Sequence, residues 1–159
     1  MCSMRTPKRA AALLAATIAA SLALAGDALA KGPDAAVITG PDLPSPLTLS
    51  YRDATRRATM AKLTTDGDFF RQAFGPASTR PRPDVALGPR YLVVYRVPGP
   101  NGNSYLRQSL YPYASGGAIT FMAKGQRFWG TRRTRGGWSR PSPSLFTALL
   151  EAGLPGPPR

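Results

Sequence analysis

The chain has 159 residues, a formal net charge of +13 at pH 7, one cysteine and no histidine. The missing histidine excludes Ser-His-Asp and Cys-His catalytic groups, histidine zinc ligands and any imidazole acid–base step. No Gly-x-Ser-x-Gly, Ser-x-x-Lys or phosphate-binding P-loop pattern is present. Composition therefore excludes many hydrolase mechanisms, and we identify no catalytic residues and no cofactor.

Residues 1–30 have the three-part layout of a secretory signal peptide. Three basic residues precede an uncharged apolar run over Ala11–Ala25, and Ala28-Leu29-Ala30 has the pattern of a cleavage site. An uncleaved membrane anchor is the alternative, but the apolar run is shorter than the roughly 20 residues that a spanning helix needs. We expect cleavage after Ala30 and a secreted or cell-wall-associated mature chain of 129 residues, without a transmembrane segment and without Cys2.

The mature chain keeps a strongly basic character. Removing residues 1–30 takes away three basic residues and Asp27, which leaves a net charge of +11. Such a surface attracts anionic polymers outside the cell, for example wall teichoic acid, acidic lipid headgroups or extracellular nucleic acid. The alternative is that a GC-rich genome favours arginine codons and that the charge only keeps the protein soluble.

The first part of the mature chain contains two predicted strands. Alternating apolar and polar residues predict strands over Ala36–Thr39 and Leu47–Tyr51, separated by a proline-rich turn. The next segment, Asp53–Thr64, mixes arginines, threonines and apolar residues too irregularly to be assigned to a helix or a strand.

A short helix is predicted over Phe69–Phe74, directly after Asp66-Gly-Asp68. A carboxylate before a helix accepts hydrogen bonds from its free backbone N–H groups, so we interpret the aspartates as helix caps. A calcium or magnesium site with oxygen ligands is the alternative. The four-residue spacing of Phe70 and Phe74 predicts that both face the core.

A β-hairpin is predicted from Tyr91–Val97 and Ser104–Tyr113, which have the strongest strand composition in the chain. Alternation places the odd-numbered residues of the first strand on one face, and Gln108 lies between two leucines of its own face. We expect a six-residue loop over Pro98–Asn103. Pro112 cannot donate a ladder hydrogen bond, so the second strand ends near it.

Further along, Ala118–Ala123 follows two glycines and predicts a third strand that pairs as a meander. Ser144–Ala152 predicts a helix, with Ser142 as its cap, Pro143 in the first turn and Gly153 at its end. The chain is therefore predicted to be a single α+β domain over residues 31–159, with a small antiparallel sheet and two helices packed on it.

The glycine- and arginine-rich stretch 124–140 contains the candidate ligand-binding residues. Clustered arginines beside a tryptophan can hold phosphates and stack on a base, a sugar or another ring. The alternative is that the stretch is a solvated loop with one aromatic side chain anchored in the core, which has the same composition. The candidate residues are Arg132, Arg133, Arg135, Trp138 and Arg140.

Side chains of the predicted sheet offer two further features. Arg90, Arg96 and Arg107 are expected on or near the sheet, where they either add to the positive charge of the molecular surface or are ordinary exposed strand residues. The tyrosines form either an exposed aromatic platform or half-buried cross-strand pairs. These tyrosines are Tyr91, Tyr95, Tyr105, Tyr111 and Tyr113.

Several short motifs together resemble small secreted proteins of actinobacteria that carry no assigned function. The motifs are Ile38-Thr-Gly-Pro41, Leu87-Gly-Pro-Arg-Tyr91, Leu110-Tyr-Pro-Tyr-Ala114 with Gly116-Gly117, Gly137-Trp138 and Gly153-Leu154-Pro155. The resemblance implies a compact α+β domain at the envelope of a high-GC Gram-positive organism. It implies no catalytic or binding residue.

The leading hypothesis is an exported, non-catalytic module that binds an anionic envelope polymer or another protein. One alternative is a cell-wall glycan enzyme that uses two facing carboxylates. Another is an inhibitor-like protein that presents Pro98–Asn103. The carboxylates available to an enzyme are Asp34, Asp42, Asp53, Asp66, Asp68, Asp84 and Glu151.

Overall fold

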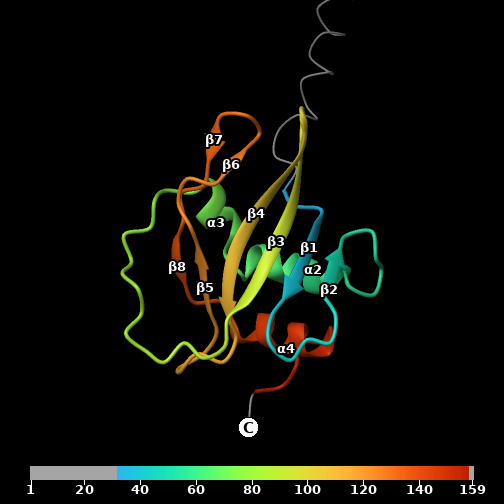
Figure 1. Cartoon of the computed structure of the whole chain (residues 1–159), viewed down its shortest axis with the longest axis vertical. Coiled ribbons are helices and arrows are strands. Elements are labelled where there is room, and N and C mark those ends of the chain that lie inside the picture. The colour runs from blue at the N-terminus through green and yellow to red at the C-terminus, as the bar shows by residue number, and fades with distance from the viewer. Residues whose placement is uncertain (1–31, 158–159) are drawn as a thin grey trace, which may run out of the picture. The chain divides into compact units, whose positions relative to one another are not determined.

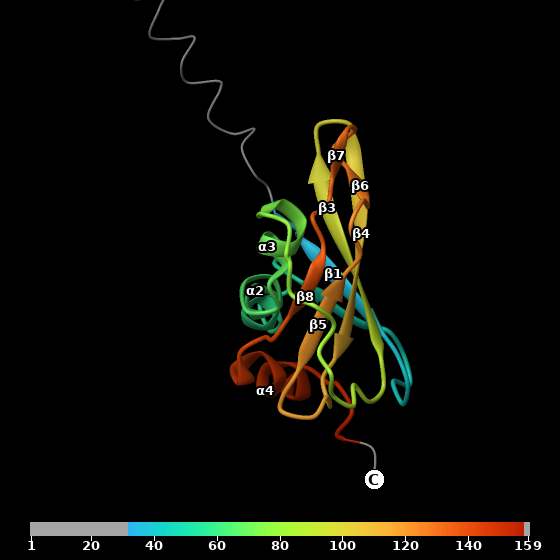
Figure 2. The same cartoon turned by 90° about the vertical axis from the view of Figure 1, so that its left-hand side faces the viewer.

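A computed structural model describes residues 32–157 and has an α+β fold. A six-stranded antiparallel sheet carries its helices on one face, as Figures 1 and 2 show. The predicted fold class is therefore confirmed. The predicted signal peptide lies outside the described residues.

The large sheet has the strand order β2-β1-β3-β4-β5-β8, with every neighbouring pair antiparallel. Its strands are β1 (Ala35–Thr39), β2 (Leu47–Ser50), β3 (Tyr91–Gly99), β4 (Gly102–Tyr111), β5 (Ile119–Met122) and β8 (Gly137–Ser139). A separate small hairpin joins β6 (Arg127–Phe128) to β7 (Arg132–Arg133). The predicted strands and meander are present. Strand β4 ends at Tyr111, the residue before Pro112.

The β3–β4 hairpin is longer and tighter than the sequence predicts. Pro98 pairs with Asn103 and Gly99 with Gly102, so only Pro100 and Asn101 remain unpaired at its end. Proline suits the first central position of such a turn, and Gly102 follows with a φ of 104°. The predicted six-residue loop is therefore wrong, because Pro98 and Asn103 continue the ladder.

Three helices cover one face of the sheet: α2 (Arg57–Thr65), α3 (Phe69–Phe74) and α4 (Pro143–Glu151). The segment that the sequence left unassigned forms most of α2. Its Thr59, Met60, Leu63 and Thr64 are buried. Spacings of three and four residues place these side chains on the sheet side, so packing on the sheet outweighs the low helix propensity of threonine.

The core lies between the helices and the inward face of the sheet. Tyr91, Val93, Tyr95 and Val97 of β3 are almost fully buried, which confirms that they share one face and shows that this face is in the core. The tyrosines of the hairpin differ in burial. Tyr91 and Tyr95 are in the core, whereas Tyr105 is 61% exposed on the opposite face of the sheet.

Helix α3 is oriented differently from the prediction. Phe69 is fully buried, whereas Phe70 is 41% exposed and Phe74 is only partly buried. Asp68 precedes the helix with a φ of 64° and makes no side-chain cap hydrogen bond. A capping residue normally has extended backbone, so this left-handed start directs the Asp68 carboxylate away from the helix N–H groups. The expected cap, and Phe70 as a core residue, are both wrong.

Helix α4 begins at Pro143, and two backbone hydrogen bonds close its C-terminal end. Leu154 N donates to Leu149 O at 2.9 Å, and Gly153 N donates to Leu150 O at 3.0 Å. Gly153 has a φ of 112°, which a glycine adopts readily at a helix end. Ser142 occupies the cap position, but its hydroxyl bonds Asp66 rather than the helix.

Candidate anion-binding surface

Basic residues are segregated along the chain. Between Asp84 and Glu151 there are nine basic residues and no acidic one. They are Arg90, Arg96, Arg107, Lys124, Arg127, Arg132, Arg133, Arg135 and Arg140. Among residues 32–157 only Arg96 of this group is in an ion pair, with Asp34. The β3–β8 part of the fold therefore has a large excess of positive charge.

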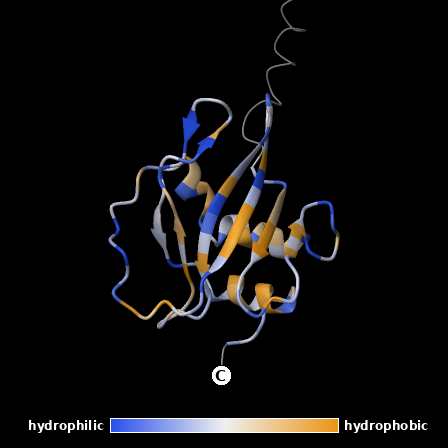
Figure 3. Cartoon of the chain, viewed as in Figure 1, coloured by the Kyte–Doolittle hydropathy of each residue, from blue (hydrophilic) through white to orange (hydrophobic). Residues whose placement is uncertain are grey.

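The small β6–β7 hairpin places two arginines directly opposite each other. Arg127 pairs with Arg133, and Phe128 pairs with Arg132. Like charges in directly opposed strand positions destabilise a hairpin. Figure 3 shows this hairpin as strongly hydrophilic. Because strand residues alternate, the adjacent Arg132 and Arg133 lie on opposite sides of it.

Aromatic packing holds the hairpin in place despite this repulsion. Phe128 is buried, and Trp129 stacks on Phe74 with 5.5 Å between ring centroids. Trp129 Nε1 donates to Pro98 O at 2.9 Å, which attaches the loop between β6 and β7 to the β3–β4 hairpin. The guanidinium carbon of Arg132 lies 5.8 Å from the Trp129 ring centroid, within the range of a cation–π contact.

Gln126 attaches β6 to the side of β4. Its Oε1 accepts from Arg107 N at 2.7 Å, and its Nε2 donates to Arg107 O at 2.7 Å. Strand β5 ends opposite Gln108, so the backbone of Arg107 has no strand partner on that side. The Gln126 amide takes the place of a neighbouring strand and brings Arg107 next to Arg127. We call Arg107, Arg127 and Arg133 the basic surface.

A groove of about 290 Å³ lies on the sheet face opposite the helices. Arg90 and Arg107 line it together with apolar and amide side chains. Arg90 Nε donates to the buried Ser109 hydroxyl at 3.0 Å, while the Arg107 side chain is exposed. The remaining lining residues are Leu92, Gln108, Phe121, Ala123 and Gln126. We call this the sheet groove.

Three aromatic rings adjoin the sheet groove on the same face. Trp138 of β8 lies 4.5 Å from Phe121 and 6.1 Å from Tyr111, between ring centroids, with interplanar angles of 33° and 29°. Trp138 Nε1 bonds no atom of the described residues, and no buried side-chain polar atom there lacks a partner. The indole N–H therefore faces solvent. We call Tyr111, Trp138 and Phe121 the aromatic row.

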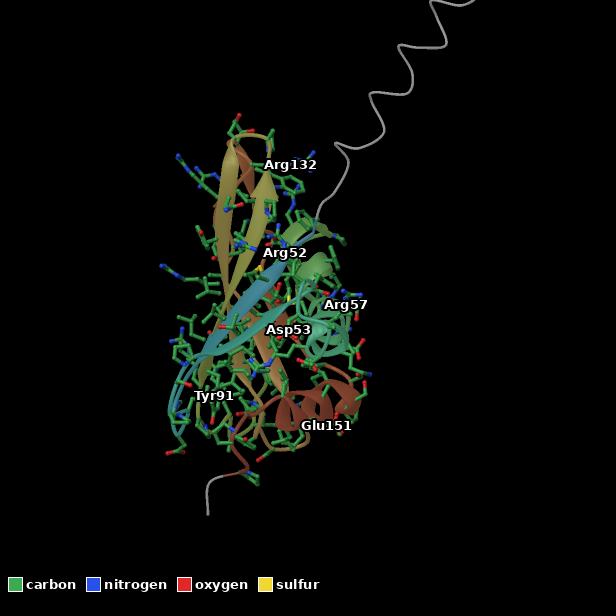
Figure 4. All side chains as sticks on the ribbon, turned by 90° about the vertical axis from the view of Figure 1, so that its right-hand side faces the viewer. Arg52, Asp53, Arg57, Tyr91, Arg132 and Glu151 are labelled. Atoms are coloured by element: carbon green, nitrogen blue, oxygen red, sulfur yellow. The ribbon has the colours of Figure 1, made fainter. Side chains whose placement is uncertain are left out.

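The structure separates the candidate residues that were predicted together. Arg132 packs on Trp129, whereas Arg133 belongs to the basic surface. Arg135 is exposed, and its backbone N donates to Gln72 O at 3.0 Å. Trp138 is half-buried on the sheet, and Arg140 bonds Gly116 O at 3.3 Å beyond the end of β8. Figure 4 shows Arg132 near the end of the molecule that carries the β3–β4 turn.

The sequence prediction omitted two members of the basic surface. Arg127 was not singled out, and Arg107 was not among the candidate ligand-binding residues, although it was expected either to add to the positive charge of the molecular surface or to be an ordinary strand residue. The absence of acidic residues between Asp84 and Glu151 is a signal that could have identified both. The pairing of Arg127 with Arg133 could not be seen in the sequence, because it depends on the turn at 129–131.

A second groove, of about 590 Å³, lies away from the basic surface. Asp34, Tyr51, Arg52 and the exposed Phe70 line it, with Gly32, Pro33 and Pro98. Asp34 binds Arg96 through two hydrogen bonds of 2.8 Å and is thereby neutralised. This groove therefore combines apolar surface with little net charge.

The carboxylates of residues 32–157 do not converge. Asp34 alone lines either groove. Asp66 accepts from Ser142 and Ser144, and these hydrogen bonds lower its pKa. Burial acts to raise the pKa of Asp68, but hydrogen bonds from Arg71 and Ser139 outweigh burial and lower it. No group of three or more metal-ligating residues occurs in this part of the chain.

No protein-family model, no curated protein and no solved structure matches this chain. Across residues 32–157, none of the helices has the length and apolar character needed to cross a membrane.

Proposed function

We propose that this is an exported, non-catalytic protein that binds an anionic polymer at the cell envelope or outside the cell through the basic surface. Export is supported by the signal-peptide layout of residues 1–30 and by the resemblance to small secreted actinobacterial proteins. The large excess of arginine in the β3–β8 part supports an anionic partner.

The observation that carries this proposal is the opposition of Arg127 and Arg133 in a hairpin that contains no carboxylate. This arrangement costs the free protein stability, and an anion between the two guanidinium groups removes the cost. Guanidinium groups also bind phosphate, sulfate and carboxylate oxygens with two parallel hydrogen bonds. Arg107 adds a third positive charge beside this pair.

Binding should be measured by retention on a heparin matrix and by titration with inorganic polyphosphate at several salt concentrations. The R127Q/R133Q variant should elute at lower salt than the wild type and should show a weaker salt dependence of polyphosphate affinity. The R52Q/R82Q variant is the matched control, because it removes the same charge at two exposed positions outside the basic surface.

Equal elution shifts for the two variants would show that net charge alone governs retention, and the basic surface would then have no special role. Release of the wild type below physiological salt would reject anion binding altogether.

A protein partner at the β3–β4 turn is a second candidate. The paired ladder through Pro98–Asn103 and the hydrogen bond from Trp129 to Pro98 favour a rigid, projecting end of this hairpin (Figure 2). Backbone amide order parameters near 0.85 are expected for Gly99 and for residues 101–103. Values below about 0.6 would remove this candidate, since a mobile turn offers no defined contact surface.

A further inference from the structure

We propose that the anionic polymer is a single-stranded nucleic acid, with its phosphates on the arginines of the basic surface and the sheet groove, and a base stacked on Trp138. This inference rests on the proposed function and adds the class of ligand. The carrying observation is the aromatic row beside an arginine-lined groove on the face of an antiparallel sheet that carries no helix.

The aromatic row suits stacking rather than anchoring in the core. Strand alternation places its three rings on the face opposite the core, because Leu110, Thr120 and Met122 point inward, and each ring is only half-buried. Phe121 and Tyr111 support Trp138 at small interplanar angles, so the indole is held in a fixed orientation. A planar base can stack on such a surface whatever its identity, because every base presents a π face.

The sheet groove supplies the polar half of the contact. Ser109 holds Arg90, whereas Arg107 is free to move towards a phosphate. Leu92 and Phe121 provide apolar surface between these two arginines. The sheet groove has a volume of about 290 Å³, which is close to the lower limit for small-molecule sites. It can hold a single ring system but not a large ligand.

The same features disfavour the other polyanions. A duplex keeps its bases stacked inside the helix, where a flat sheet face cannot reach their rings. Inorganic polyphosphate and acidic polysaccharides contact the arginines but contain no aromatic base for Trp138. Anionic lipid surfaces are bound by projecting apolar side chains, whereas the rings of the aromatic row lie packed against one another.

The test measures the affinity of purified protein for a fluorescein-labelled 12-nucleotide oligothymidylate by anisotropy, with inorganic polyphosphate as a second ligand. The W138L variant should bind the oligonucleotide about tenfold more weakly and should bind polyphosphate unchanged. W138F keeps a ring and should recover most of the affinity. Phe70 of α3, exposed on the helix side of the fold and outside the sheet groove, provides the control variant F70L.

The variants are first compared by thermal melting, and the W138F result separates lost stacking from lost structure. Equal oligonucleotide affinities for W138L and wild type would overturn base stacking on Trp138. Tighter binding of heparin, duplex DNA or phosphatidylglycerol vesicles than of the oligonucleotide would overturn single-stranded nucleic acid as the ligand. Each of these results leaves the proposed function intact. If the protein bound none of these polyanions, the proposed function itself would be rejected.

Discussion

Gln72 of α3 and Gln108 of β4 are joined inside the core by a hydrogen bond of 2.6 Å, from Gln108 Nε2 to Gln72 Oε1. Gln108 also donates to Gly67 O and accepts from the Tyr95 hydroxyl. Gln72 Nε2 donates to Gly137 O at 2.9 Å. No buried side-chain polar atom among residues 32–157 lacks a partner. This polar network therefore fixes α3 relative to the centre and the edge of the sheet.

Replacing Gln108 by leucine should destabilise the fold. The substitution leaves the Tyr95 hydroxyl, Gly67 O and Gln72 Oε1 buried without this partner, and each buried group that stays unpaired costs about 1–3 kcal/mol. Urea unfolding should show a loss of about 2–4 kcal/mol in the free energy of unfolding for Q108L.

The variant Y95F provides the control for this network, because it removes a single hydroxyl and should cost about 1 kcal/mol. The double variant should lose less than the sum of the two, since both changes break the same hydrogen bond. A Q108L protein as stable as the wild type would contradict the role assigned to Gln108.

Asp68 should make stability dependent on pH in the acid range. The Arg71 and Ser139 hydrogen bonds lower its pKa in the folded state, so its contribution is present above its unfolded pKa and is lost as the pH falls through the folded value. At pH 7 the variant D68N should lose about 2 kcal/mol of unfolding free energy.

Chemical unfolding between pH 7 and pH 2 measures this effect. The difference between wild type and D68N should shrink as the pH falls below about 4. The control is D84N, which removes an exposed loop carboxylate. A difference that does not change with pH would show that Asp68 acts through packing and not through its charge.

Removing the charge opposition in the β6–β7 hairpin should stabilise the free protein. Arg133→Thr takes away one of two directly opposed charges and introduces a good strand former, so we expect a gain of about 0.2–1 kcal/mol at low salt. The gain should fade as added salt screens the repulsion. Thermal melting at low and high salt tests this, with R82T at an exposed loop position as the control.

The same substitution should weaken polyanion binding, because the opposed charges also form the proposed site. Polyphosphate should therefore raise the melting temperature of the wild type more than that of R133T. Arg133 also donates to Gly125 O at 3.2 Å, so an R133T protein that is less stable than the wild type at low salt would show that the repulsion between the arginines is weaker than this hydrogen bond.

Gly99 should not tolerate a side chain. A Cβ there would overlap Trp129 Cδ1 and lie 2.9 Å from Trp129 Nε1. Gly99→Ala should therefore displace the indole from Pro98, change tryptophan fluorescence and cost about 1–3 kcal/mol. The control is G156A, where a Cβ meets nothing within 4 Å. Unchanged fluorescence in G99A would contradict the contact between Trp129 and the β3–β4 hairpin.

The β3–β4 hairpin shows which structural features a local sequence pattern can predict. Alternation correctly placed Tyr91, Val93, Tyr95 and Val97 on one shared face, because a strand's side-chain period depends only on its backbone. The length of the hairpin was mispredicted, because proline and glycine normally end strands. Here Pro98 continues the ladder while its carbonyl accepts the Trp129 indole N–H, a contact 31 residues away.

The aspartates before α3 show where local pattern fails. Asp66 and Asp68 have the composition of helix caps, but instead of the helix N–H groups they bind local side chains and serines from the C-terminal part of the chain. Ser142 and Ser144 lie more than 70 residues from Asp66, and Ser139 lies 71 residues from Asp68. No short window of sequence contains these donors.

By itself the sequence determined the α+β class, the faces of the central strands, the C-terminal helix and the missing imidazole chemistry. These follow from residue type and from short periodic spacing, which act within a few neighbouring residues. Only the tertiary structure decided that Arg127 opposes Arg133, that Arg107 lies beside them and that Trp138 packs beside Phe121 and Tyr111. Strand pairing and side-chain packing bring together residues that are distant in the chain, and no local pattern records which partners meet.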